Sequence, residues 1–245
     1  MKRHGFLVAA AIFLLAASGL LYLTHYLIFR DAHHIYIYLL GDFAFLPLQV
    51  LLVGLIIDRI LSWREKQAML GKMNMVVGVF FSEMGTRLLG ELLPGFDRSQ
   101  IMAGLGVRPN WDANDFRRAT AFADTLKAQA DCRAINLDAL KDFLSHERDL
   151  LLRLLENPNL LEHERFTDML WAVSHLAEEL EARPQLQNLP KSDEAHIGQD
   201  IGRAFTALAA EWLDYVQHLK SNYPYLFSLV LRMHPLQDRP SATVT

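Results

Sequence analysis

Two long apolar segments near the N-terminus dominate the pattern of hydrophobic and polar positions. Phe6 to Phe29 contains no charged residue, and a second apolar run from Ile35 to Ile57 is interrupted only by Asp42. As a helix with a rise of ~1.5 Å per residue, the first run would extend about 36 Å, which is enough to cross a bilayer core. The pattern predicts a transmembrane hairpin over residues 1–57, with spans at about 6–29 and 35–57.

The helical pattern does not stop at the end of the second span. Helix-forming residues continue without a break to Gly71, and apolar positions then recur every three or four residues as far as Leu92. We therefore expect a juxtamembrane helix over residues 58–93 that continues the second span. Trp63 lies about two turns beyond the apolar segment, where an indole ring would sit among lipid headgroups.

The remaining sequence predicts further helices joined by polar connections. Residues 94–110 contain several Gly and Pro residues and are typical of an irregular connector. Helical spacing returns over residues 111–236, including one helix from Asn136, as its N-cap, to Leu155. Residues 237–245 form a polar tail. No segment alternates with period two, so the predicted fold class is all-α: a transmembrane hairpin followed by a bundle of about five helices.

Positive charge flanks both apolar segments. Lys2 and Arg3 precede the first span, and residues 59–72 carry four basic residues against Glu65. Farther along, residues 136–200 contain 14 acidic and six basic residues. By the positive-inside rule, both termini face the cytoplasm, so the bundle is expected to be a cytoplasmic domain on the inner membrane. A cleaved signal peptide is the competing interpretation of the first span, but its apolar core is too long for one.

Composition narrows the possible functions. The chain is 51% hydrophobic and shows no cluster of Lys and Arg of the kind that nucleic-acid-binding domains carry. Cys132 is the single cysteine, which excludes an intramolecular disulfide. Its thiol is a conceivable nucleophile, but no base is assigned to it by the sequence.

Motifs for catalysis and metal binding are incomplete. Two His-Glu pairs begin like the zincin motif but lack the second histidine four residues after the first: His146-Glu147 and His163-Glu164. His175 and Glu178, three residues apart on one helix face, remain as candidate metal ligands, although the ligand set of a di-iron bundle is missing. Glycine-rich phosphate loops and nucleophile elbows do not occur. We therefore expect a non-enzymatic protein with no catalytic residue, no cofactor and no metal site.

Asp42 is the most unusual residue of the hairpin. It lies ~10 Å into the second span at helical rise, where a carboxyl group is costly and usually faces a partner or a cavity. His25 should lie at a similar depth on the opposing helix, so we expect the two side chains within about 4 Å or one bridging water. A protonated Asp42, or one that reaches toward the loop, is the alternative. Pro47 should kink this span.

Three stretches of the sequence carry a resemblance to a known group of proteins. These are LGKMNMVVGVFFSEMG at 70–85, ENPNLLEHERFTD at 156–168 and YPYLFSL at 223–229. They resemble uncharacterised bacterial two-span inner-membrane proteins over nearly the whole chain. The resemblance implies a membrane location and a helical cytoplasmic domain, and it brings no activity with it.

The last apolar segment, Tyr223 to Met233, has two interpretations. It is either a helix of the bundle core or an interfacial helix that lies against lipid headgroups, with Tyr223 and Tyr225 as anchors.

The expected function is that of an integral inner-membrane protein whose helical domain mediates protein interaction or self-association. The alternative is a membrane-bound sensor or small-ligand-binding domain. The expected partners are the lipid bilayer and either a second copy or another membrane or cytoplasmic protein, with no nucleic acid. A polar cavity would favour the ligand alternative, and an exposed apolar stripe would favour a protein partner.

Overall fold

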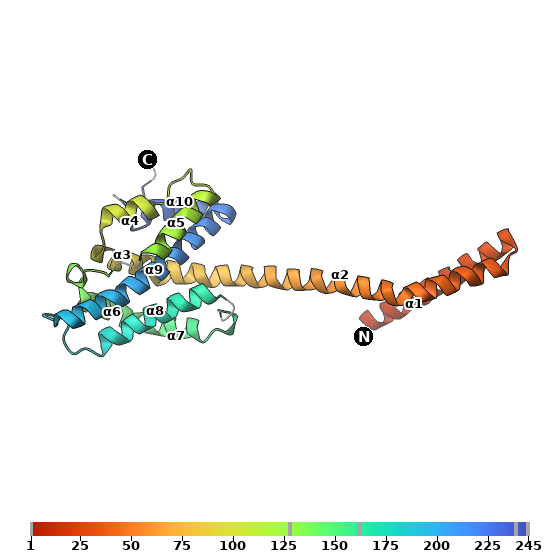
Figure 1. Cartoon of the computed structure of the whole chain (residues 1–245), viewed down its shortest axis with the longest axis horizontal. Coiled ribbons are helices and arrows are strands. Elements are labelled where there is room, and N and C mark those ends of the chain that lie inside the picture. Colours follow the sequence, from red (N-terminus) through yellow and green to blue (C-terminus); the bar gives the residue numbers. More distant parts are fainter. Residues whose placement is uncertain (1, 127–128, 161–162, 238–239, 244–245) are drawn as a thin grey trace. The chain divides into compact units, whose positions relative to one another are not determined.

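A computed structural model gives an all-helical chain, which confirms the predicted fold class. It describes residues 2–126, 129–160, 163–237 and 240–243, and no strand occurs among them. The chain divides into two units, residues 1–66 and residues 67–245 (Figure 1). The long helix α2 (Ala32–Phe80) contributes residues to both units.

The first unit contains α1 (Lys2–Phe29) and the N-terminal part of α2. The chain reverses at Arg30, which has a φ of 54°, and at Asp31. Asp31 Oδ1 accepts hydrogen bonds from the backbone N–H groups of His33 (2.9 Å) and His34 (3.2 Å), and so caps α2. Because of this cap the turn is shorter than predicted, and the second helix begins at Ala32 rather than at Ile35.

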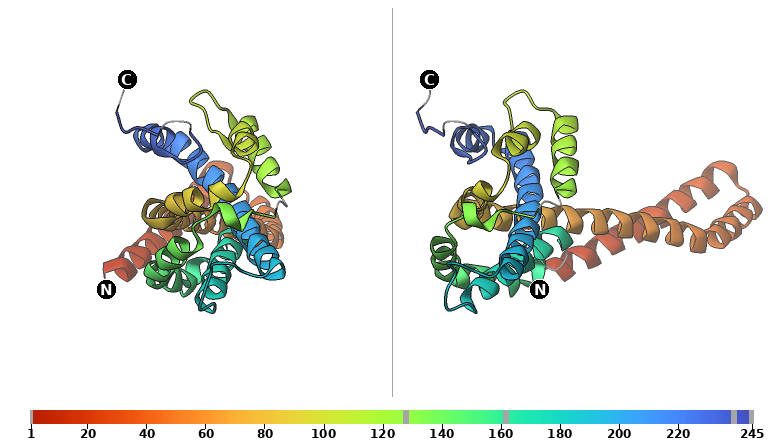
Figure 2. Two further views of the ribbon diagram at one scale, coloured as in Figure 1. Left: turned by 90° about the vertical axis from the view of Figure 1, so that its left-hand side faces the viewer. Right: turned by 60° about the vertical axis from the view of Figure 1, so that its left-hand side comes forward.

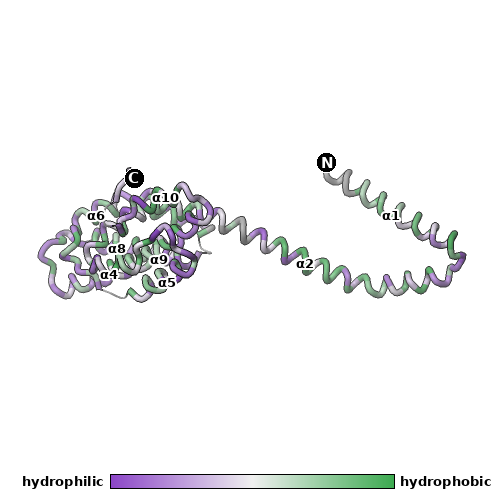
Figure 3. Tube along the Cα trace, turned by 90° about the horizontal axis from the view of Figure 1, so that it is seen from above, coloured by the Kyte–Doolittle hydropathy of each residue, from purple (hydrophilic) through white to green (hydrophobic). Residues whose placement is uncertain are grey.

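Apolar side chains cover the outside of this hairpin. Two segments, Val8–Phe29 and Ala32–Glu65, are long and apolar enough to cross a membrane, and no residue in their most apolar windows is buried. Most of the trace of these segments is coloured as hydrophobic in Figure 3. Leu40 is 75% exposed and Phe43 is 73% exposed. A surface of this kind needs a covering of lipid or of other protein.

The central helix of the second unit is α9 (Lys191–Asn222), seen in blue in Figure 2. Among the described residues, its main helical neighbours are α3 (Thr86–Leu92), α5 (Ala113–Thr125), α8 (Glu164–Glu181) and α10 (Pro224–Met233). The remaining helices are α4 (Arg98–Leu105), α6 (Leu137–His146) and α7 (Arg148–Leu155). Apolar residues at helical spacing form the buried face of α9: Ile197, Ile201, Phe205, Leu208, Trp212 and Leu219.

A π-helical turn, Phe81–Gly85, joins α2 to α3 inside the core of this unit. The turn changes the phase of the helix, so that the consecutive residues Phe80 and Phe81 are both buried. Thr86 Oγ1 donates a hydrogen bond to the carbonyl oxygen of Phe81 (2.8 Å). A Cβ atom at Gly85 would lie 2.5 Å from the ring of Phe80, so any larger residue would force that ring to move. The helix expected over residues 58–93 thus contains a π turn at Phe81–Gly85, but the chain does not reverse its direction there.

Two expectations for this unit are wrong. Residues 94–110 are not a wholly irregular connector, because Asp97 caps α4 by accepting hydrogen bonds from the backbone N–H groups of Ser99 and Gln100. The helix expected from Asn136 to Leu155 is divided at Glu147 into α6 and α7. Asn136 does cap α6, as predicted, since its Oδ1 accepts from the backbone N–H of Ala139 (3.1 Å).

Candidate functional site

An open cleft of about 960 Å³ runs beside α9, and the buried acid Glu211 lines it. Its lining comes from the end of α5, from α8 and from α9. Polar side chains predominate among the lining residues, including Asp124, Gln129, Arg165, Asp168, Gln199 and Glu211.

Glu211 is the buried acid of this cleft. Its side chain is 3% exposed, and its Oε1 atom has no hydrogen-bond partner among the described residues. Arg165 is the nearest base, with Nε 3.6 Å from Glu211 Oε1. Burial raises the pKa of Glu211 to about 7; Arg165 opposes this shift, and Asp214 and Asp124 add to it.

Around Arg165, carboxyl groups outnumber basic groups. The guanidinium group donates a hydrogen bond to Asp214 Oδ2 (3.2 Å) and lies 3.8 Å from Asp124 Oδ1. One arginine therefore faces three carboxyl groups, from α5 and α9. This arrangement favours a ligand that brings positive charge.

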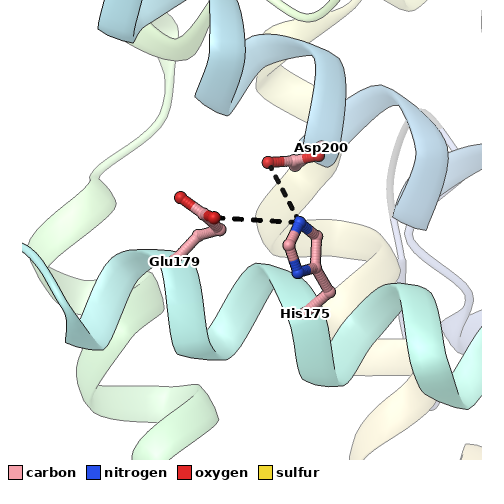
Figure 4. Close-up of side chains that lie close together, drawn as sticks. All are labelled: His175, Glu179 and Asp200. Atoms are coloured by element: carbon pink, nitrogen blue, oxygen red, sulfur yellow. Dashed lines mark ion pairs between the residues drawn. The ribbon is translucent and has the colours of Figure 1, made fainter.

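A second polar cluster lies where the end of α8 meets the start of α9 (Figure 4). Each helix contributes a histidine and a carboxylate four residues apart, which places the two side chains on one helix face. The pairs are His175 with Glu179 on α8, and His196 with Asp200 on α9. We call these four residues the His–carboxylate cluster.

Distances within the His–carboxylate cluster are short but exceed those of good hydrogen bonds. His175 Nε2 lies 3.8 Å from Glu179 Oε1 and 3.7 Å from Asp200 Oδ2. His196 Nε2 lies 3.4 Å from Glu179 Oε2 and 3.5 Å from Asp200 Oδ2. His175, Glu179 and Asp200 each offer one ligand atom within 4.8 Å of the other two, and His196 approaches the same two carboxylates from α9.

Two arginines orient the carboxylates of the cluster. Arg183 Nη1 donates a hydrogen bond to Glu179 Oε2 (2.6 Å), and this bond is the main reason that the pKa of Glu179 is lowered. Arg183 also pairs with Asp193 (2.6 Å), at the start of α9. Arg203 Nη1 donates to Asp200 Oδ1 (3.0 Å). Asp200 Oδ2 remains buried without a hydrogen-bond partner among the described residues.

Comparison with known proteins gives the family. Residues 69–232 match the family model described as "Uncharacterized protein MJ1433, C-terminal helical domain", and residues 2–61 match "MJ1433, N-terminal helical domain". The protein named "Uncharacterized protein MJ1433" of Methanocaldococcus jannaschii is 44% identical over 239 residues, which cover 98% of this chain and 96% of the relative. The chain belongs to the MJ1433 family. No solved structure matches it.

The two MJ1433 domains correspond closely to the two structural units. The family models meet between residues 61 and 69, and the units divide between Lys66 and Gln67. The cleft and the His–carboxylate cluster both lie in the MJ1433 C-terminal helical domain. Because the relative is archaeal, the bacterial origin that the sequence resemblance implied is not supported.

Asp42 and His25 lie in the MJ1433 N-terminal helical domain, where they line one cavity of about 470 Å³ with Ser18, Tyr22 and Tyr38. Both residues are among those described, and no ion pair joins them. The predicted direct pair is therefore not formed, and a water-bridged contact stays a prediction.

The candidate metal pair is corrected by the structure. Glu178 is exposed and outside the cluster, whereas Glu179, one residue farther along α8, lies beside His175. A spacing of four residues, repeated as His196-x-x-x-Asp200, was the sequence signal that could have identified the cluster.

The other candidate residues have simpler surroundings. Cys132 is buried, and burial raises the pKa of its thiol, which disfavours the nucleophilic thiolate. His163 caps α8 by accepting a hydrogen bond from the backbone N–H of Phe166 (3.1 Å). Trp63, Tyr223 and Tyr225 are exposed, as an interfacial role requires.

Proposed function

We propose that this member of the MJ1433 family is a two-span membrane protein whose C-terminal helical domain binds a small, positively charged ligand in the cleft beside Glu211. The membrane assignment rests on the two apolar helical segments, whose side chains face outward. The basic residues that flank them support a cell-membrane location with both termini on the cytoplasmic side.

Topology is tested with reporter fusions at residue 32 and at the C-terminus. We expect the fusion at residue 32 to report an external location and the C-terminal fusion to report a cytoplasmic one. An external C-terminus would refute the charge argument and would place the cleft in a different compartment.

The observation that carries the ligand proposal is the environment of Glu211. A carboxyl oxygen that is buried without a hydrogen-bond partner costs about 1–3 kcal/mol or more, and a protein retains such a group when it has a use for it. The cleft volume of about 960 Å³ lies near the upper end of the range for small-molecule sites. An ammonium group next to Glu211 would compensate both the missing hydrogen bond and the excess of negative charge around Arg165.

Binding of a cationic ligand is tested on the full chain in mild detergent with a panel of primary amines, diamines and polyamines. Titration calorimetry should detect a member of this panel and should detect no binding of carboxylic acids of the same size. Glu211→Gln should lower the affinity for the amine by at least about tenfold, which corresponds to ~1.4 kcal/mol of binding free energy.

The matched control is Asp142→Asn, which removes an exposed carboxylate on α6, away from the cleft. Equal affinities for wild type and Glu211→Gln, or equal binding of acids and amines, would contradict the proposal.

Association with a second copy or another protein is the second candidate function. It is favoured by an apolar groove of about 360 Å³ between the end of α2, α9 and α10. Met75 and Val79 are 65% and 51% exposed there, and Leu226 lies on the opposite side of the groove. Met75→Glu should lower the molecular mass of the detergent-solubilised protein in light scattering if this groove is a homodimer interface.

A further inference from the structure

The His–carboxylate cluster has the geometry of a metal site. We infer that His175, Glu179, His196 and Asp200 bind one divalent transition-metal ion, of which Zn²⁺ suits the ligands best. This site goes beyond the proposed ligand cleft, because it needs no organic ligand and does not use Glu211, although His196 and Arg203 also line the cleft.

The spacing of the ligand atoms agrees with a tetrahedral ion. Zinc bonds of about 2.0–2.2 Å to nitrogen and oxygen require ligand atoms that are about 3.3–3.6 Å apart. The four nitrogen–oxygen distances in the cluster are 3.4, 3.5, 3.7 and 3.8 Å, so two lie within this range and two lie just above it. His175 faces Glu179 Oε1, and His196 faces Glu179 Oε2. Ordinary hydrogen bonds would be shorter, at roughly 2.7–3.2 Å, so the four nitrogen–oxygen contacts are too long to be good hydrogen bonds between the side chains.

Asp200 gives independent evidence for a ligand. Its side chain is 2% exposed, and the oxygen that faces both imidazoles, Oδ2, has no hydrogen-bond partner among the described residues. Its other oxygen, Oδ1, is held by Arg203. A buried carboxylate oxygen is costly when it has no partner, and a metal ion bound to Oδ2 would remove that cost.

The surrounding residues also suit a metal site. Arg183 and Arg203 orient the two carboxylates from behind, which is the usual role of residues that contact metal ligands from outside. Both histidine side chains are about half exposed, 45% for His175 and 49% for His196, so an ion has an entry path. Two imidazoles with two carboxylates form a set that accepts Zn²⁺ and its spectroscopic substitute Co²⁺.

The test uses the full chain in mild detergent after treatment with a chelator. Titration with Zn²⁺ against a chromophoric competitor should give one ion per chain. Co²⁺ should produce the intense visible absorption of tetrahedral coordination.

The double variant His175→Gln/His196→Gln should weaken Zn²⁺ binding by well over tenfold and abolish the Co²⁺ spectrum. Its matched control, His33→Gln/His34→Gln, removes two exposed histidines at the start of α2 and should bind as the wild type does.

Two further outcomes bear on the site. Asp200→Asn keeps the shape and removes the charge, so it should also lose binding. If a change at buried Asp200 prevents folding, the His175→Gln/His196→Gln variant still tests metal binding, because its substitutions are at half-exposed side chains. Equal binding by wild type and by the His175→Gln/His196→Gln variant, or a weak octahedral Co²⁺ spectrum in both, would overturn the inference.

Discussion

The burial of Glu211 makes a specific prediction about how stability depends on pH. Glu211→Gln replaces the carboxyl group by an amide of the same shape that carries no charge. The wild-type protein has to bury a carboxylate above its pKa, whereas the variant does not. Arg165 from α8, Asp124 from α5 and Asp214 from α9 face this position in both proteins.

The magnitude follows from the pKa. Burial raises the pKa of Glu211 to about 7 from its ordinary 4.5, and each pKa unit corresponds to ~1.36 kcal/mol. A carboxyl group with a raised pKa contributes stability that is fully present below its unfolded pKa and is lost as the pH rises through about 7. Glu211→Gln should therefore be more stable than wild type by about 3 kcal/mol at pH ~8, and this advantage should vanish below pH ~4.5.

Denaturant unfolding of the full chain in detergent, followed by near-ultraviolet circular dichroism of the buried Trp212, measures this difference at several pH values. Asp168→Asn, an exposed carboxylate of the same cleft, is the control and should change stability by less than about 0.5 kcal/mol. A Glu211→Gln protein that is less stable than wild type at pH ~8 would refute the reasoning, because it would mean that the charge stabilises the fold through Arg165.

Other parts of the second unit give further predictions. His234 is 1% exposed, and burial lowers its pKa to about 4, so its contribution to stability is lost as the pH falls from about 6.5 toward 4. Between pH ~7 and ~5, wild type should lose about 2 kcal/mol more stability than His234→Gln in the same unfolding assay, and equal losses would contradict this. Gly85→Ala should cost about 1–3 kcal/mol, because its Cβ would lie 2.5 Å from the ring of Phe80. Gly71→Ala in α2 is the control: it meets no atom within 4 Å and should gain up to about 1 kcal/mol in thermal unfolding.

Much of the fold could be predicted because the buried positions of a helix recur every three or four residues in the sequence. Helical spacing over residues 111–236 predicted helices, and α9 buries apolar residues at this spacing, Trp212 among them. Caps and breaks are weaker signals, since they depend on single side chains. Asp97 starts α4 within a stretch whose Gly and Pro residues predict a loop, and the break at Glu147 has no Gly or Pro to mark it.

The candidate site was harder to predict because it depends on which polar residues become buried. Hydrophobic periodicity treats Asp200 and Glu211 as solvent-facing, yet neither side chain is more than 3% exposed. Their burial comes from the packing of α5 and α8 on α9, which the spacing within one helix cannot show. The predicted metal ligands His175 and Glu178 were half right for the same reason. His175 lies in the cluster, but only the position of α9 shows that its neighbour there is Glu179 rather than Glu178.

The contacts of the π turn have a consequence for the timing of folding during synthesis. Phe80 packs edge-on against Phe166 at 5.5 Å, and Phe81 stacks on Tyr215 at 5.1 Å. At ~5–20 residues per second, Tyr215 leaves the ribosome on the order of ten seconds after Phe81. Phe166 emerges earlier within that interval, but Phe81 lacks its stacking partner until Tyr215 has been made. A chain truncated before α9 should therefore remain a target for chaperones and proteases, even with both apolar helical segments complete.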